Sequence, residues 1–442
     1  MDDELDQFTT TVQEAAISAP YLVLDKVIQD LAPSGYKLDR MLFQQPEHFA
    51  NISSLISTTP KSAIQATIMV MTYLSHATYV YGYDITEQER WDRFCFKYVE
   101  TSLPWIASKF FLDQTYSDER RDFVTTMTED LRSAYLQRLE GIEWITKETK
   151  ALVHEKISNI VTKIGYPEHT PNARNATDLM AYYSPIQITE SLYKNVISIR
   201  EWDHNRVWDL LNHPVDQKIW PGSTVYAWIA NAFYANVWSY AVIPAGITQA
   251  PIYYEGAPSY ITYSSLGMIL GHELTHALDT DGRLWDQNRR YKSWWDEQSI
   301  ANFENRSECF VKQYSEMKAV DNFGEAILNQ DGKPYFVNGT MTVSENIADA
   351  GGLGMAWEAW LAHEKKGPSR SLPGLENFTK EQLFYINSAQ TWCTKSSRKS
   401  MLSLLLEESH APGFARILGP TQNSKGFNDA FQCKREPVCE LW

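Results

Sequence analysis

The spacing of apolar residues predicts helices in the first part of the chain. From Ser117 to about Trp144, apolar residues recur every three or four positions, which places them on one helix face. Ser117 and the two acidic residues after it provide a helix cap and a negatively charged first turn. A second helix is expected from about Thr146 to Lys163, ending at the Gly-Tyr-Pro sequence that follows.

One further apolar run, Ile64 to Leu74, is interrupted by Gln65 and Thr67. A helix that spans a bilayer needs about 20 predominantly apolar residues, and this run is shorter and partly polar. We therefore expect a core helix here and no membrane span in this chain.

The composition of the chain changes after Pro167. Up to about His204 it is richer in Pro, Asn and Thr, which is typical of a connecting segment. Between Thr224 and Tyr254, β-branched and aromatic residues alternate with Pro and Gly, which predicts one or two strands. Helical patterns return at about Thr262. We therefore expect a mainly α-helical protein with a small β element, divided into a helical region 1–165, a connecting segment 166–205 and a domain 206–442.

The overall composition indicates a globular protein with a large core. Of the 442 residues, 43% are hydrophobic and 13% are aromatic. The formal net charge of −15 argues against a nucleic-acid partner, because phosphate binding needs a basic surface. The first residues, Met1 to Glu4, have neither the basic start nor the apolar segment of a signal peptide, so the sequence shows no targeting signal.

Two features nevertheless favour a secretory route. The chain contains Asn-x-Ser/Thr sequons, acceptors for N-glycans, at more positions than the roughly two or three that chance would give. Its cysteines are odd in number, which in a secreted protein implies a missing partner. The sequons begin at Asn51, Asn175, Asn305, Asn338 and Asn377, and the cysteines are Cys95, Cys309, Cys393, Cys433 and Cys439.

The motif His272-Glu273-Leu274-Thr275-His276 carries the strongest chemical signal. Histidines four residues apart lie on the same helix face, so both imidazoles can reach one Zn²⁺. Glu273 lies beside the first histidine, where it can take a proton from a water molecule on the metal. Apolar residues on the other face can bury the helix. The alternative is an ordinary helix with two surface histidines, and the motif alone supplies no third ligand.

A second segment, Ser344-Glu345-Asn346-Ile347-Ala348-Asp349, can supply that ligand. Ser344 is a suitable N-cap, and Glu345 and Asp349 share one face of the helix that follows. A catalytic zinc site needs a carboxylate ligand and a carboxylate that orients a ligand histidine. Taken alone, acidic pairs at this spacing are common and usually just solvated.

Together the two segments resemble the neprilysin and endothelin-converting-enzyme family of zinc metallopeptidases. That family combines a His-Glu-x-x-His helix with a downstream Glu-Asn-Ile-Ala-Asp helix. The similarity is continuous from about Trp208 to the last residue and weaker from Cys95 onward. Further matching motifs follow in the family's order: Asn231-Ala232-Phe233-Tyr234, Pro244-Ala245-Gly246-Ile247, Trp392-Cys393, His410-Ala411-Pro412-Gly413 with Arg416, and Cys439-Glu440-Leu441-Trp442.

The resemblance implies a fold and a role for each matching residue. It implies a thermolysin-like zincin catalytic domain over 206–442 and part of a second, chamber-forming helical domain over 1–165. One Zn²⁺ per chain would be bound, with a general base, two orienting carboxylates and an oxyanion donor beside it. The ligands would be His272, His276 and Glu345, the base Glu273, the orienting residues Asp349 and Asp279, and the donor His410.

Substrate contacts are implied in the same way. The main chain of a peptide would be held by Asn231, the backbone of Ala232 and Arg416. An apolar pocket would receive the residue after the cleaved bond, although plain core packing is the alternative for its members. These members are Ile247, Ile252, Met268, Ile269 and Trp392.

The chain also departs from the family. Relatives carry a membrane anchor or signal and a longer helical region, so we expect this chain to be N-terminally truncated. Cys309 and Cys439 match a family disulfide, whereas the other three cysteines match residues with partners in the absent region. Ser344 stands where the family usually has Gly, Thr248 where Leu is common, and Ser239-Tyr240 where Asn-Glu is frequent.

The resemblance therefore implies a zinc-dependent endopeptidase acting on small peptides, before hydrophobic residues, in the secretory pathway or outside the cell. One alternative is a catalytically inert truncated relative or a peptide-binding pseudo-peptidase. Another is an aminopeptidase of a different zinc clan, which would lack the Asn-Ala and His…Arg elements seen here.

Overall fold

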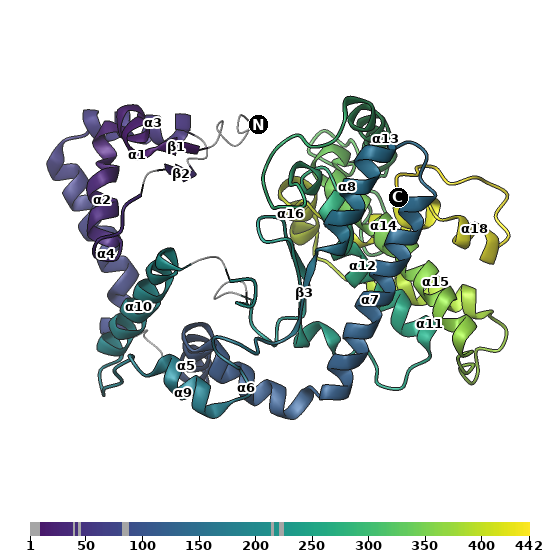
Figure 1. Cartoon of the computed structure of the whole chain (residues 1–442), viewed down its shortest axis with the longest axis horizontal. Coiled ribbons are helices and arrows are strands. Elements are labelled where there is room, and N and C mark those ends of the chain that lie inside the picture. Colours follow the sequence, from purple (N-terminus) through teal and green to yellow (C-terminus); the bar gives the residue numbers. More distant parts are fainter. Residues whose placement is uncertain (1–8, 39, 43–45, 82–87, 214–215, 221–224) are drawn as a thin grey trace. The chain divides into compact units, whose positions relative to one another are not determined.

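The computed structural model describes residues 9–38, 40–42, 46–81, 88–213, 216–220 and 225–442 (Figure 1). The chain divides into two compact units, each built from two separate stretches of sequence. Unit 1 consists of Met1–Phe110 and Pro167–Thr224, and unit 2 of Phe111–Tyr166 and Val225–Trp442. In the described residues, no helix combines the length and the apolar character that a membrane crossing requires.

Unit 1 is helical apart from an antiparallel pair of short strands, β1 and β2. Helices α4 and α10 pack against each other. Its elements are β1 (Thr9–Thr11), α1 (Val12–Ser18), η2 (Pro20–Leu22), α2 (Leu24–Leu31), β2 (Arg40–Leu42), α3 (Pro46–Thr58), α4 (Lys61–Tyr81), α5 (Gln88–Ser102), α9 (Ala176–Tyr183), α10 (Leu192–Asp209) and η3 (Leu210–Asn212), and α6 (Pro104–Thr115) continues into unit 2.

The predicted helix at Ile64–Leu74 is present within α4, but the expectation that it is a core helix is wrong. Met69, Met71 and Leu74 are 71%, 63% and 60% exposed. An apolar run predicts burial only where another element covers it. The stretch read as a connecting segment contains the two helices α9 and α10, so the compact units do not follow the linear boundaries at 165 and 205.

Unit 2 combines helices with one three-stranded sheet. Its elements are α7 (Asp118–Glu140), α8 (Lys147–Ser158), β3 (Val161–Gly165), β4 (Phe233–Ala235), β5 (Tyr240–Pro244), η4 (Ala245–Thr248), α11 (Ser259–Thr262), the π-helical segment η5 (Tyr263–Gly267), α12 (Met268–Thr275), η6 (His276–Leu278), η7 (Gly282–Leu284), α13 (Glu297–Ser315), α14 (Gly339–Lys366), α15 (Lys380–Thr391), α16 (Arg398–Glu407), α17 (Gly413–Gln422) and α18 (Lys425–Ala430).

The helix predicted from Ser117 is α7, and the Ser117 side chain accepts a hydrogen bond from the backbone of Arg120 as a cap should. The helix predicted from Thr146 is only half right. It ends at Ser158 as α8, and Val161–Gly165 form strand β3 instead. β-branched residues favour this strand, and it gains a partner 79 residues later, because Val161 lies opposite Tyr240.

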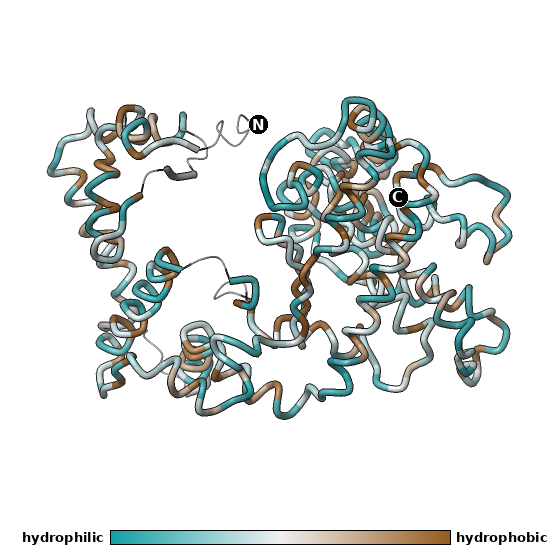
Figure 2. The backbone as a smooth tube through the Cα atoms, viewed as in Figure 1, coloured by the Kyte–Doolittle hydropathy of each residue, from teal (hydrophilic) through white to brown (hydrophobic). Residues whose placement is uncertain are grey.

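The sheet has the order β3-β5-β4, with β3 parallel and β4 antiparallel to β5. The strands predicted between Thr224 and Tyr254 are therefore β4 and β5. All five residues of β5 are buried, and the trace of the paired strands near the label β3 in Figure 1 includes strongly hydrophobic stretches in Figure 2. β4 is an edge strand, which leaves one of its sides open for another chain to pair with.

The last residues of the chain are tied to the core of unit 2. Cys309 of α13 and Cys439 form a disulfide, as the resemblance implied. The ring of Trp442 lies 5.4 Å from that of Trp144 and 6.1 Å from that of Phe303. The remaining cysteines, Cys95, Cys393 and Cys433, are free thiols.

Candidate metal centre and active site

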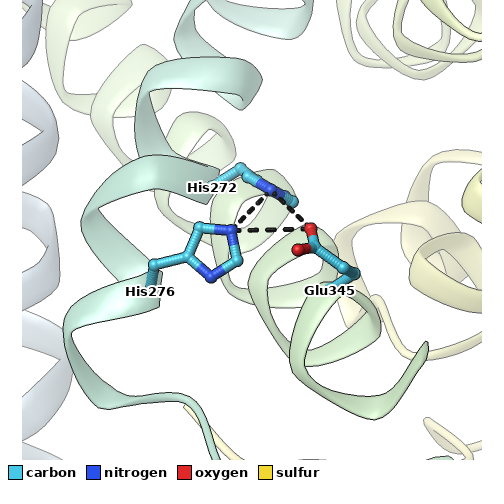
Figure 3. Close-up of side chains that lie close together, drawn as sticks. All are labelled: His272, His276 and Glu345. Atoms are coloured by element: carbon cyan, nitrogen blue, oxygen red, sulfur yellow. Dashed lines mark hydrogen bonds and ion pairs between the residues drawn. The ribbon is translucent and has the colours of Figure 1, made fainter. Parts of the chain in front are cut away.

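The two motif histidines lie one turn apart on a buried helix. His272 belongs to α12, and His276 begins the short turn η6 that ends it. Leu270 and Leu274 are at most 1% exposed and anchor α12 in the core. The imidazoles project from the helix toward Glu345 of α14 (Figure 3).

Helix α14 lies against α12 at backbone distance. A Cβ atom added to Gly352 would lie 2.5 Å from the backbone nitrogen of His272, and one added to Gly271 would lie 2.9 Å from the carbonyl oxygen of Gly352. Only glycine permits such an approach. The short distance between the helices brings Glu345 within reach of both histidines.

The predicted N-cap of this helix is wrong. Helix α14 begins at Gly339, and the side chain of Asn338 caps it by accepting a hydrogen bond from the backbone of Met341. Ser344 lies inside the helix. Asn338, six residues upstream, is an equally suitable cap, so the helix begins six residues earlier, nearly two turns, than the pattern at Ser344 suggested.

Three ligand atoms converge between the two helices. The Nε2 atoms of His272 and His276 are 3.0 Å apart, and they lie 3.2 Å and 3.5 Å from Oε2 of Glu345. A tetrahedral zinc ion with bonds of about 2.0–2.1 Å would separate its ligands by about 3.3 Å. Since neutral imidazoles that donate through Nδ1 present only lone pairs at Nε2, three electron donors face one point, and this donor set fits Zn²⁺.

Both imidazoles are held from behind by carboxylates. Nδ1 of His272 is 2.8 Å from Oδ1 of Asp349, and Nδ1 of His276 is 2.6 Å from Oδ2 of Asp279. Both aspartates are 2% exposed. Carboxylates in this position fix the tautomer and the ring orientation of metal-binding histidines.

Arg416 of α17 completes the support of Asp349. Its Nε donates to Oδ2 of Asp349 at 2.8 Å and its terminal nitrogen to Oδ1 at 2.7 Å. The guanidinium carbon lies 3.6 Å from the ring centre of Trp392, so the group is stacked on that ring. Burial raises the pKa of Asp349, but the opposing effect of Arg416 and His272 is larger. The net pKa is therefore below the ordinary value, and the carboxylate stays ionised.

Glu273 and His410 lie beside the centre, where both line a cavity. Glu273 is 6% exposed, and burial raises the pKa of its carboxyl group against the opposing effect of His272 and His276. Nε2 of His410 lies 3.1 Å from Oε2 of Glu345, and its side chain is 46% exposed. Burial also raises the pKa of Glu345, but the three surrounding imidazoles lower it well below its ordinary value.

The centre opens into a cavity of about 550 Å³ within unit 2. Nearly all the substrate-contacting residues expected from the resemblance line this cavity. The cavity is also lined by residues that the sequence did not predict to contact substrate, namely Tyr234, Asn236, Asp281, Ser344 and Thr391. Met268 lies behind the wall instead: it is 3% exposed, and its sulfur accepts a hydrogen bond from Ser388. The expected residues in the wall are Asn231, Ala232, Ile247, Ile252, Ile269, Trp392 and Arg416.

One rim of the cavity is the segment that enters edge strand β4. Ala230 to Tyr234 all line the cavity. The side-chain oxygen of Asn231 accepts a hydrogen bond from the backbone nitrogen of Ala232 at 3.0 Å. A strand edge beside a cavity can bind an extended peptide by main-chain pairing.

The sequence of the chain is similar to family models and to proteins of known function. Two family models, both described as Peptidase family M13, match residues 231–439 and 2–167. Endothelin-converting enzyme homolog of Locusta migratoria is 33% identical over 358 residues, which are 79% of this chain and 46% of that protein. Neprilysin of Homo sapiens is 31% identical over 365 residues, which are 81% and 46% of the two chains. The chain thus spans just under half the length of these relatives.

Solved structures share the fold. The zinc metalloprotease ZMP1 of Mycobacterium tuberculosis, in complex with an inhibitor, gives a TM-score of 0.78 at 22% identity. The match covers 98% of this chain and 64% of the ZMP1 chain. PepO from Lactobacillus rhamnosis gives a TM-score of 0.76 at 22% identity, and the match covers 99% of this chain and 66% of the PepO chain. The resemblance noted in the motifs is confirmed along most of the sequence, and the chain belongs to peptidase family M13.

Proposed function

We propose that this chain is a zinc-dependent endopeptidase that hydrolyses small peptides. The observation that carries the proposal is the convergence of His272, His276 and Glu345 at the floor of a cavity large enough for several peptide groups. Membership of a peptidase family supports the same reading. Zinc bound by these three residues would polarise the scissile carbonyl and activate a water molecule.

Glu273 is proposed as the general base. It takes a proton from the attacking water and passes it to the leaving amine. Its burial supports this role, because desolvation raises the pKa of the carboxyl group toward the range of an effective base. His410, which lines the cavity, donates a hydrogen bond to the oxyanion.

The peptide is proposed to lie along the rim at Asn231 and Ala232, antiparallel or parallel to β4, with Arg416 near a backbone carbonyl. Ile247, Ile252 and Ile269 form the apolar part of the wall. This lining favours cleavage before a hydrophobic residue. The disulfide between Cys309 and Cys439 supports a place of action in an oxidising compartment, such as the secretory pathway or the cell exterior.

The test combines metal content with hydrolysis of an internally quenched peptide by the full 442-residue chain. We expect one zinc per chain and hydrolysis that a chelator abolishes. Glu273→Gln should keep the metal and lose hydrolysis, whereas His272→Ala should lose both. Hydrolysis that survives in Glu273→Gln would refute the mechanism.

The inert-relative alternative makes a different prediction. A pseudo-peptidase would bind zinc and peptide without hydrolysis in the wild-type chain, and an incomplete chain would bind no zinc. Release of single residues from a free N-terminus alone would favour the aminopeptidase reading.

A further inference from the structure

The carboxylate of Asp279 is fully engaged. Its Oδ1 accepts hydrogen bonds from the backbone nitrogens of Asp281 and Gly282, at 2.9 Å and 2.6 Å. Its Oδ2 accepts from Nδ1 of His276 and from the hydroxyl of Ser344, both at 2.6 Å. A carboxylate oxygen has two lone pairs, so the two donors on Oδ2 do not exclude each other.

The hydroxyl of Ser344 donates to Asp279 and not to a backbone carbonyl of its own helix. Serine within a helix commonly donates to the carbonyl one turn earlier, which stabilises nothing beyond the helix. Here it reaches a carboxylate 65 residues away in sequence. Ser344 also directly precedes the ligand Glu345 on α14, so one bond connects the helix of the third ligand to the group that orients the second ligand.

We propose that Ser344 is a positioning residue of the metal centre, which holds Asp279 in line with His276 and so fixes that imidazole relative to Glu345. The proposal rests on the zinc-binding role put forward above. A glycine at this position would offer no side-chain donor, so the contact depends on the hydroxyl of Ser344. Outer carboxylate partners typically change metal affinity about 10- to 100-fold when they are lost.

The experiment compares zinc affinity in the full chain and in the variants Ser344→Ala, Ser344→Gly and Ser344→Thr. Affinity is measured by competition with a chromophoric chelator, and ligand geometry by the visible absorption of the Co²⁺-loaded protein. Ser403→Ala is the matched control, because the exposed Ser403 hydroxyl donates to a carboxylate oxygen of Glu407 at the same 2.6 Å outside the cavity.

Ser344→Ala and Ser344→Gly should bind zinc about tenfold more weakly and shift the Co²⁺ bands. Ser344→Thr, which keeps a hydroxyl, and Ser403→Ala should match the wild-type chain in both measurements. The inference is overturned if Ser344→Ala keeps wild-type affinity and an unchanged Co²⁺ spectrum, or if Ser344→Thr is as weak as Ser344→Ala. A wild-type chain that takes up no zinc would overturn the proposed function itself, and the inference with it.

Discussion

Gly352 lies directly against the backbone of His272, with room for a hydrogen atom and none for a methyl group. The contact sets the distance between the helix with two proposed zinc ligands and the helix with the third. We expect Gly352→Ala to lower the free energy of unfolding by about 1–3 kcal/mol through overpacking, and to abolish stoichiometric zinc binding. Denaturant titration and metal analysis check both effects.

Gly354 offers the control for this prediction. A Cβ atom there would meet only the end of the flexible Arg138 side chain, at 3.1 Å. Gly354→Ala should therefore keep its zinc. Equal loss of metal in the two variants would show that α14 is sensitive to any substitution and that the backbone contact is not special.

The ion pair between Arg416 and Asp349 predicts a large stability effect. Arg416→Ala would leave the buried Asp349 carboxylate without its main counter-charge, which costs about 3–5 kcal/mol for a buried pair. Urea unfolding of the metal-free protein measures this separately from activity. Lys425→Ala, which removes an ion pair exposed on both sides, should leave the unfolding midpoint unchanged.

The hydrogen bonds to the carboxylate of Asp296 lead us to expect a specific dependence of stability on pH. Burial raises the pKa of its carboxyl group, but hydrogen bonds from the hydroxyls of Thr146, Thr149 and Ser299 lower it well below the ordinary value. The folded pKa is lower than the unfolded one, so these bonds stabilise the protein above about pH 4 and are lost as the pH falls toward the folded value.

We therefore expect Asp296→Asn to destabilise the protein at pH 7 and to have a smaller effect near pH 3. Urea midpoints at both pH values check this. Glu297→Gln, at the next residue, should behave like the wild-type chain at both. A constant difference between Asp296→Asn and wild type at all pH values would contradict the prediction.

A second dependence of stability on pH, of the same sign but in the alkaline range, is expected from Lys156. It is 2% exposed and donates to the carbonyl oxygens of Gly282 and Trp285, in the turn that follows Asp279. Burial lowers its pKa to about 7, although Asp279 and Asp286 oppose the shift. A neutral amine still has two N–H donors for two carbonyls.

Between about pH 7 and pH 10 the unfolded lysine keeps a proton that the folded one has lost, so stability contributed by this residue rises with pH. Lys156→Met should remove this rise and, by leaving two carbonyls unpaired, lower the free energy of unfolding by about 2 kcal/mol at pH 9. Unfolding midpoints across this range test it, with Lys150→Met as the control. An unaltered rise in the variant would rule out Lys156 as its source.

The helical character, the two strands of the 224–254 region and the placing of the motif residues on single helix faces could be predicted from the sequence, because each depends on spacing within a few residues. His272 and His276 lie one turn apart in any helix, and so do Glu345 and Asp349. The start of α14 at Gly339 was missed because two suitable caps, Asn338 and Ser344, compete in one short segment.

Other features depend on contacts that local patterns do not contain. The helix predicted up to Lys163 ends at Ser158, because Val161 to Gly165 pair with β5, a partner that no local pattern contains. The bond from Ser344 to Asp279 joins residues far apart in sequence, and the only earlier sign of it was a serine in place of glycine. The exposure of α4 likewise depends on which elements lie near it.

The order of the strands has a practical consequence for producing unit 2 alone. β5, the central strand, pairs with β3 from before residue 167 and with β4 from after residue 224. A fragment cut at the boundary expected from sequence, near residue 206, would lack α7, α8 and β3 and would expose an apolar strand edge, a template for aggregation. An autonomous version of this unit therefore requires two pieces, 111–166 and 225–442, expressed together or joined by a designed linker.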